Sequence, residues 1–400
     1  MKRVVTVIGT RPEAIKLIPL HLALKKAGFD AILCATFQHS DLLDQVFTLF
    51  QIKPDIHLDV MKQNQDLFYL TKTILEKIKP IYEAINPDLV LVQGDTTTAF
   101  CSALGAFYAK IPVGHVEAGL RSGNIYAPFP EEANRRFIST IATYHFAPTE
   151  LNAANLIAEG VARDAIFCTG NTVVDALLWI KDQITIKKLL IDQTIRDLVQ
   201  RSRDNHQKIV LLTAHRRESF DGGLTRIFKS IKLFAQTHRD IFIMYPYHPN
   251  PNVIRAMQES GIQSEENIHI CPPVAYKELV YLLMSAHVVI TDSGGIQEEA
   301  ISLGKKVIVL RDITERTEAV LAGMAKLVGS NETLLLKVLQ EFYQEAQIQK
   351  TQIIETPNYV FGDGRACQSI VSILQEKIHH AGTRQKSTLV TKFGQPIKTF

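Results

Sequence analysis

The sequence is poor in the features that mark membrane, disulfide-rich and nucleic-acid-binding proteins. No apolar run approaches the roughly 18 residues of a membrane span. The five cysteines are an odd number with no two close in sequence, which indicates buried thiols in a reducing compartment rather than a disulfide or zinc framework. The net charge of +3 is nearly balanced, whereas nucleic-acid binding requires a strongly basic face. We therefore expect a cytoplasmic protein with no metal, no membrane attachment and no nucleic-acid partner.

The glycine-rich G-x-G-x-x-G signature of dinucleotide-binding proteins is also missing after the first apolar run, where the sequence reads GTRPEAIK. In those proteins the signature brings the backbone close to the pyrophosphate of the cofactor. We therefore predict no bound nicotinamide.

Short apolar runs alternate with helical patterns in both halves of the chain. The runs lie at residues 4–9, 31–36, 88–93, 113–116 and 165–169, and again at 208–213, 240–245, 267–271, 287–291 and 306–310. Continuous apolar strands separated by helices are typical of a parallel sheet that is covered on both faces. We predict an α/β fold of two doubly wound, Rossmann-like domains that face a central cleft.

The length of 400 residues also favours two domains over one. We place an N-terminal domain at residues 1–175 and a C-terminal domain at 176–363, and we expect a helix at 364–380 to complete the N-terminal domain. The last segment, 381–400, carries four basic residues and no acidic ones, and we expect a mobile basic tail there.

The segment GTRPEAIK follows the first predicted strand and begins a helix. Thr10 and Glu13 form a capping box, and Arg11 and Lys16 add positive charge at the helix N-terminus. Ligands of such sheets bind beyond the carboxyl ends of the strands, and a helix N-terminus with two cations suits an anion there. A capped helix with two solvated bases explains the same pattern, and we interpret Glu13 as a structural cap.

Acidic residues follow two further strands of the first half. Asp95 lies in GDTTT at the end of one strand, and Glu117 lies just past the end of the next. Glu131 and Glu132 begin a helix, where the macrodipole favours acids. Asp95 can be explained as a helix cap alone. If Asp95, Glu117 and Glu131 converge in a cleft shielded from water, they can serve as proton donors and acceptors.

The segment AHRRESF follows the first strand of the second half. A lone histidine is usually structural, but His215 beside Arg216 and Arg217 at a strand end suggests a phosphate site. His248 lies in a proline-rich loop further along the chain.

The segment DSGGIQEEA directly follows another strand of the second half. Ser293, Gly294 and Gly295 open a helix with little steric bulk, so backbone N–H groups can approach a diphosphate. Glu299, about one helical turn further on, is placed to accept hydrogen bonds from a ribose. Arg316 lies near the same rim, although a surface ion-pair face also explains its segment. These residues predict a nucleoside diphosphate held by the second domain, with the acids of the first domain facing the group it carries.

Seven segments in this order resemble the motifs of the non-hydrolysing UDP-N-acetylglucosamine 2-epimerases: GTRPEAIK, QGDTTT, HVEAGLRS, PFPEEANRR, TAHRRES, DSGGIQEEA and the ER of RDITER. The resemblance covers residues 9 to about 365. It implies a GT-B-like fold and a homodimer that interconverts UDP-GlcNAc and UDP-ManNAc for cell-surface polysaccharide synthesis. In that family UDP is eliminated to leave a 2-acetamidoglucal and then adds back, and no redox cofactor takes part.

The resemblance also implies roles for individual residues. Its acid–base and diphosphate-contacting positions fall on Asp95, Glu117, Glu131 and His215. Its substrate-binding positions fall on Arg11, Lys16, Ser293, Gly294, Gly295, Glu299 and Arg316. Some members bind a second UDP-GlcNAc as an activator, and the matching residues are Gln38, His39, Arg216 and His248. Glu132 and Arg135 are expected to support the geometry of the acids.

The sequence departs from the family pattern at several positions. Phe37 replaces the glycine of a TGQH segment, and the remaining departures, near the uracil or at former prolines, are Val274, Leu279, Ile301, Lys306 and Thr317. The substituents at C3 and C6 of the sugar are therefore open, and a 2,3-diacetamido sugar or its uronic acid is an alternative substrate. The motifs also leave open a GT-B glycosyltransferase, a hydrolysing epimerase and a non-catalytic sugar-nucleotide sensor.

Overall fold

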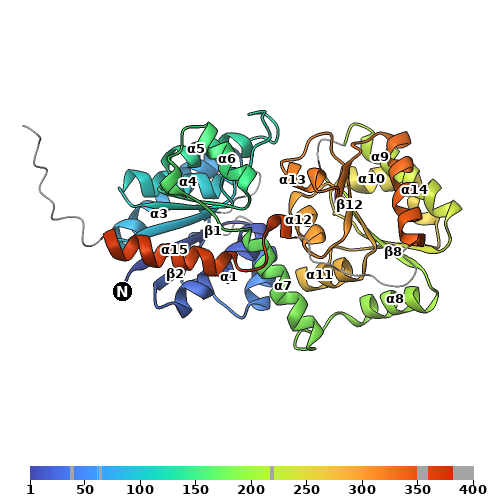
Figure 1. Cartoon of the computed structure of the whole chain (residues 1–400), viewed down its shortest axis with the longest axis horizontal. Helices are drawn as coiled ribbons and strands as arrows, with labels where there is room; N and C mark the ends of the chain where they lie inside the picture. The colour runs from blue at the N-terminus through green and yellow to red at the C-terminus, as the bar shows by residue number, and fades with distance from the viewer. Residues whose placement is uncertain (37–39, 61, 63–64, 217–219, 349–358, 382–400) are drawn as a thin grey trace, which may run out of the picture.

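The computed structural model describes residues 1–36, 40–60, 62, 65–216, 220–348 and 359–381 (Figure 1). The predicted tail, apart from its first residue, and the positions Phe37, Gln38 and His39 lie outside these ranges. Each half of the chain forms a parallel sheet flanked by helices (Figure 1).

Within the described residues, the first sheet has seven strands and the second has six. The first contains β1 (Arg3–Ile8), β2 (Asp30–Ala35), β3 (Ile56–His57), β4 (Leu89–Gln93), β5 (Val113–Val116), β6 (Tyr144–Ala147) and β7 (Ile166–Cys168). The second contains β8 (Lys208–Thr213), β9 (Ile241–Pro246), β10 (Ile268–Cys271), β11 (Val288–Thr291), β12 (Lys306–Val309) and β13 (Ala325–Leu327). The ten strands predicted from apolar runs are present.

The strand order is β3-β2-β1-β4-β5-β6-β7 in the first sheet and β10-β9-β8-β11-β12-β13 in the second. Both orders reverse direction once, as in doubly wound nucleotide-binding folds, so the predicted fold class is confirmed. Three strands were not predicted. β3 and β13 are only two and three residues long, and the apolar run of β6 is interrupted by His145.

Helices cover both faces of each sheet (Figure 1). Around the first sheet lie α1 (Arg11–Lys26), α2 (Ser40–Leu49), α3 (Leu67–Ile85), α4 (Thr97–Tyr108), α5 (Glu131–Ile141), α6 (Glu150–Ala158) and α15 (Ala366–Ala381). Around the second lie α8 (Gln193–Asp204), α9 (Gly223–Thr237), α10 (Pro251–Ser260), α11 (Tyr276–Ser285), α12 (Gly294–Ser302), α13 (Thr317–Leu321) and α14 (Glu332–Ile348). Short 3-10 turns occur at Arg163–Ala165, Ile262–Ser264 and Tyr359–Phe361.

The central strand β1 shows why its sequence is mostly apolar. Val4 and Ile8 pack in the core shared with α1 and α15, whereas Val5 and Val7 pack in the core shared with α3 and α4. Successive side chains of a strand point to opposite faces, so a sheet covered on both sides favours apolar residues at nearly every position. Fully burying each such side chain stabilises the fold by roughly 1.5–3 kcal/mol.

The helix α7 (Thr172–Thr185) connects the two sheets (Figure 1). Asn171, its N-cap, donates a backbone hydrogen bond of 2.8 Å to the carbonyl of Phe361, where the chain returns toward the first sheet. Asp175 accepts from the N–H groups of Ala366 and Cys367 at 3.1 and 2.8 Å and so holds the start of α15. α15 then packs against α1 and α7. The division into domains at residue 175 stays a prediction.

No helix in the described ranges combines the length and the apolar character that a membrane crossing requires.

Three buried histidines make stability sensitive to acid. Burial lowers the pKa of His21 to about 4, that of His115 to about 3 and that of His145 to about 4. Unperturbed histidine has a pKa of about 6.5, so below that pH the unfolded chain binds protons that the folded chain does not. The contribution of these rings to the free energy of unfolding is therefore full above about pH 6.5 and is lost as the pH falls toward about 4.

Thermal unfolding followed by circular dichroism from about pH 7 to about pH 4 measures this loss. His21→Leu is the informative variant, because His21 is fully buried and neither ring nitrogen has a partner among the residues described. Over this pH range we expect the Tm of His21→Leu to fall less than that of the wild type. The difference corresponds to up to roughly 3 kcal/mol in the free energy of unfolding. Equal falls in the two proteins would contradict this assignment.

Candidate active site

The candidate site lies where the two sheets reverse their strand order. These reversals fall between β1 and β4 and between β8 and β11. The segments after these strands are 9–10, 94–96, 214–216 and 292–293, and each lies within one of the seven motifs identified in the sequence. Parallel sheets bind ligands at such points, beyond the carboxyl ends of their strands.

Side chains from the two halves contact one another directly across this region. The bridging pairs are Arg316–Glu117, Arg135–Glu315, Thr149–Glu318 and Asn171–Glu298. The structure therefore brings Glu117, a predicted acid of the first half, against Arg316, a predicted cation of the second half.

Glu117 is the central carboxylate of the site and is 5% exposed. Its Oε2 accepts hydrogen bonds from Lys16 Nζ and Gln93 Nε2. Its Oε1 lies 3.2 Å from Nη2 of Arg316. Burial alone would raise the pKa of Glu117, but the two cations outweigh it and lower the pKa below its ordinary value. Glu117 is therefore an ionised carboxylate shielded from water, as a proton acceptor requires.

The backbone at Glu117 is in the left-handed region, with φ of 64°. Residues with a side chain seldom adopt this conformation, and such positions cluster at functional sites. The turn that follows requires a glycine at position 119. Its φ is 90°, and an added Cβ would lie 2.2 Å from the carbonyl oxygen of Asn152. The local chain is thus shaped to direct Glu117 inward.

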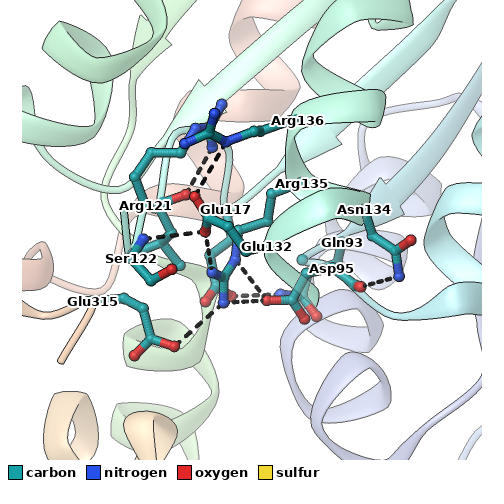
Figure 2. Close-up of polar contacts among 12 residues, drawn as sticks. Gln93, Asp95, Glu117, Arg121, Ser122, Glu132, Asn134, Arg135, Arg136 and Glu315 are labelled. Atoms are coloured by element: carbon teal, nitrogen blue, oxygen red, sulfur yellow. Dashed lines mark hydrogen bonds and ion pairs between the residues drawn. The ribbon is translucent and has the colours of Figure 1, made fainter. Parts of the chain in front are cut away.

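Asp95 is held by Arg135 (Figure 2). Nε and Nη2 of Arg135 lie 2.8 and 2.6 Å from Oδ2 of Asp95, and Nη1 lies 2.7 Å from Glu132. Nη2 also reaches Glu315 of the second half at 3.4 Å. Burial would lower the pKa of Arg135, but these acids raise it above its ordinary value. The contacts of Glu132 and Arg135 agree with the supporting part predicted for them.

Glu131 differs from Glu117 because one of its oxygens is free. Its Oε2 is buried without a hydrogen-bond partner in the described chain. Burial, assisted by the nearby Asp95, raises its pKa above the ordinary value. A carboxyl group that holds its proton more tightly is suited to act as the acid opposite an ionised Glu117.

His215 is held by Asp292 at the end of β11. Its Nδ1 lies 3.2 Å from Oδ1 of Asp292, while Oδ2 accepts from the backbone N–H groups of His215 and Arg216 at 2.5 and 2.7 Å. The ring of His248 stacks on that of His215, with centroids 5.2 Å apart. Burial would raise the pKa of Asp292, but His215 and these N–H groups lower it. Asp292 thus fixes the Nδ1 edge of the imidazole and, among the residues described, leaves Nε2 for a ligand.

Asp292 opens the segment DSGGIQEEA but was not predicted as a site residue, and its place at a strand end was the available signal. Of the predicted activator residues, Arg216 and His248 lie beside His215, whereas Gln38 and His39 fall outside the described residues.

The helix α12 begins at the glycines predicted to approach a diphosphate. Its N-cap Ser293 makes no side-chain capping bond within the residues described, so the helix N-terminus is open to an anion. A Cβ added at Gly294 would lie 2.7 Å from Cζ of Arg316, whereas one at Gly295 would meet nothing within 4 Å. Gly294 therefore makes room for Arg316, and Gly295 leaves open space.

Glu299, the predicted ribose contact, is buried behind Tyr276. The hydroxyl of Tyr276 donates to Oε1 of Glu299 at 2.5 Å, and burial raises the pKa of Glu299 to about 7. Tyr276 was not predicted from the sequence. A cavity of about 180 Å³ adjoins it, lined by Arg11, Gln45, Val46, Thr48, Leu49, Gln51, Leu189, Ala275, Tyr276 and Lys277. A ribose bound by Glu299 must share that carboxylate with the tyrosine hydroxyl.

A family model described as UDP-N-acetylglucosamine 2-epimerase matches residues 22–375. The chain belongs to this family. The UDP-N-acetylglucosamine 2-epimerase of Escherichia coli O157:H7 is 46% identical over 377 residues, which cover 93% of this chain and 98% of that protein. The crystal structure of UDP-GlcNAc 2-epimerase from Neisseria meningitidis bound to UDP-GlcNAc is 42% identical and superposes with a TM-score of 0.86 over 94% of this chain and 100% of that one.

Membership of this epimerase family makes the chain an isomerase and confirms the resemblance drawn from the motifs. The GT-B-like fold is also confirmed. MurG from Acinetobacter baumannii superposes with a TM-score of 0.52 at 13% identity, over 94% of this chain and 100% of that one. That likeness concerns the fold alone.

Proposed function

We propose that this isomerase interconverts UDP-GlcNAc and UDP-ManNAc without hydrolysing them. The observation that carries the proposal is Glu117, an ionised and buried carboxylate paired with one cation from each half of the chain. The relative from Neisseria meningitidis, whose structure contains UDP-GlcNAc, adds support because its similarity extends over nearly the whole chain.

In the proposed reaction, Glu117 removes the proton from C2 of the sugar. The electron pair of the C2–H bond forms the C1=C2 double bond, and the C1–O bond breaks so that UDP leaves with its electron pair. In this proposal His215, Arg316 and the N-terminus of α12 stabilise the diphosphate as its negative charge develops, which their positions support.

The second half-reaction restores the sugar with the opposite configuration. Glu131, assisted by Asp95, returns a proton to the other face of C2, and a diphosphate oxygen forms the new bond to C1. Arg135 fixes the carboxylate of Asp95 for this step. The sum is an isomerisation with no net oxidation, and it needs no co-reactant.

Proton NMR of UDP-GlcNAc with the purified protein in D2O tests the function. We expect deuterium at C2 and growing signals of UDP-ManNAc, because the proton that returns comes from solvent-exchanged carboxyl groups. Free ManNAc and UDP would indicate a hydrolysing enzyme instead. Binding of UDP without exchange at C2 would contradict the proposed reaction.

The proposal also includes a homodimer, a cytoplasmic location and a place in cell-surface polysaccharide synthesis. Exposed aromatic side chains on α4 and α5, Phe107, Tyr108 and Phe137, support a contact between two copies, which sedimentation can test. The five thiols are free, which suits a reducing compartment, but the prediction that they are all buried was wrong, because Cys168 is exposed. Arg216 and His248 beside His215 support a site for an activating nucleotide.

A further inference from the structure

Glu298 is a buried carboxylate that neither the family motifs nor the proposed reaction assigns a role. It is 1% exposed and lies on α12, next to the predicted ribose contact Glu299. Its Oε1 lies 2.8 Å from Nε of Arg316, and its Oε2 accepts a hydrogen bond of 2.7 Å from Nδ2 of Asn171. Both oxygens are therefore engaged, as a buried carboxylate requires.

The contact with Nε determines how Arg316 is oriented. The guanidinium group is a rigid plane, so fixing Nε also fixes the directions of the two Nη atoms. With Nε on Glu298, Nη2 lies 3.2 Å from Glu117 and Nη1 lies 3.5 Å from Glu315. The guanidinium of Arg316 thus contacts three acids, and one of them, Glu117, belongs to the first half of the chain.

The second partner of Glu298 is Asn171, where the chain enters α7 and crosses between the two sheets. Asn171 caps α7 through its Oδ1, which accepts from the N–H of Val173 at 3.2 Å. Its own N–H donates to Phe361, on the returning segment, at 2.8 Å. The side chains of Asn171, Glu298 and Arg316 therefore link this crossing to Glu117 by direct contacts.

We infer that Glu298 is a positioning residue, which holds Arg316 in the orientation that serves both Glu117 and the departing diphosphate. This inference rests on the proposed function, because it concerns the proton acceptor of that reaction. The charge of Glu298 also limits how strongly Arg316 stabilises the ionised form of Glu117.

The charge environment of Glu117 predicts the direction of the effect. The charged and titratable groups that face it are Lys16 of α1, Arg135 of α5, Glu298 of α12 and Arg316 just before α13. The negative charge of Glu298 partly offsets the effect of Arg316 on the pKa of Glu117, and a neutral residue at position 298 removes that offset. The pKa of Glu117 then falls further, and Glu117 becomes a weaker proton acceptor.

The test compares Glu298→Gln with the wild-type enzyme in the UDP-GlcNAc epimerisation assay over a range of pH. We expect kcat to fall by about 10²-fold, as misplacement of a reacting group does. KM is expected to stay within about threefold, and the acidic limb of the kcat profile should move to lower pH. Glu266→Gln, at an exposed position, is the matched control and should leave all three quantities unchanged.

Two further variants keep the test decisive if Glu298→Gln does not fold. Glu298→Asp retains the charge and should recover part of the lost kcat. Asn171→Ser removes the hydrogen bond to Oε2, while serine can still cap α7, and it should lower kcat in the same direction but less. Circular dichroism establishes which of the three proteins are folded.

The outcomes separate the inference from the function on which it rests. A wild-type protein that does not epimerise UDP-GlcNAc would contradict the proposed function itself. An active wild type with an unchanged kcat and pH profile in Glu298→Gln would overturn the positioning role and leave the function intact. A rise of KM alone, or a fall of kcat without the shift of the acidic limb, would also overturn it.

Discussion

Glu117→Gln is expected to abolish exchange of the C2 proton and to lower kcat by about 10²–10⁴-fold. Glutamine has nearly the same shape as glutamate but only one acceptor oxygen, so it can keep the hydrogen bond from Lys16 or the one from Arg316, which contact different oxygens of Glu117. Its amide cannot take up a proton at the pH of the reaction. The variant should therefore still bind UDP with nearly the wild-type affinity, because the cations and the helix N-terminus that hold the diphosphate are retained.

Deuterium incorporation followed by NMR and UDP binding followed by calorimetry measure these two properties separately. Glu83→Gln is a suitable control, because Glu83 lies on the surface in an exposed ion pair with Lys79. This variant should exchange the C2 proton at the wild-type rate. A Glu117→Gln protein that exchanges the C2 proton as fast as the wild type would remove Glu117 from the mechanism.

Gly294→Ala is expected to displace Arg316 and so to lower both stability and kcat. The added Cβ would lie 2.7 Å from Cζ of Arg316. The guanidinium cannot simply move aside, since it is held at 2.8 Å by Glu298 and at 3.2 Å by Glu117. Overpacking of this kind typically costs about 1–3 kcal/mol.

The neighbouring glycine provides the matched control for stability. A Cβ at Gly295 meets nothing within 4 Å and the position is helical, so Gly295→Ala should not lower the Tm of the unliganded protein. Thermal unfolding of both variants without ligand, followed by kcat of Gly294→Ala, completes the experiment. Equal Tm values for the wild type and both variants would show that Arg316 has more freedom than its ion pairs indicate.

Much of the site was predictable because its motifs lie directly at strand ends. Asp95 and Glu117 each follow an apolar run, and in a parallel sheet such positions meet at one edge. The same reasoning located His215 and the glycines of α12. The strands were predictable for a related reason, since burial on both faces makes their sequences continuously apolar.

The roles of adjacent acids were not predictable in this way. Glu298 and Glu299 are neighbours in the sequence, but successive helical residues point in directions about 100° apart. Glu298 therefore contacts Arg316 and Asn171, whereas Glu299 contacts Tyr276. The local sequence does not indicate which partner Glu298 contacts and which partner Glu299 contacts.

The sequence by itself determined the doubly wound fold, the family and the segments that carry the site, because these depend on periodicity and on motifs within short stretches of chain. Only the tertiary structure decided which charges share one partner. Arg316 joins Glu117 across 199 positions, and Asn171 joins Glu298 across 127. Such pairs depend on how α7 and the two sheets pack together, because ion pairs between side chains are strong only where that packing excludes water.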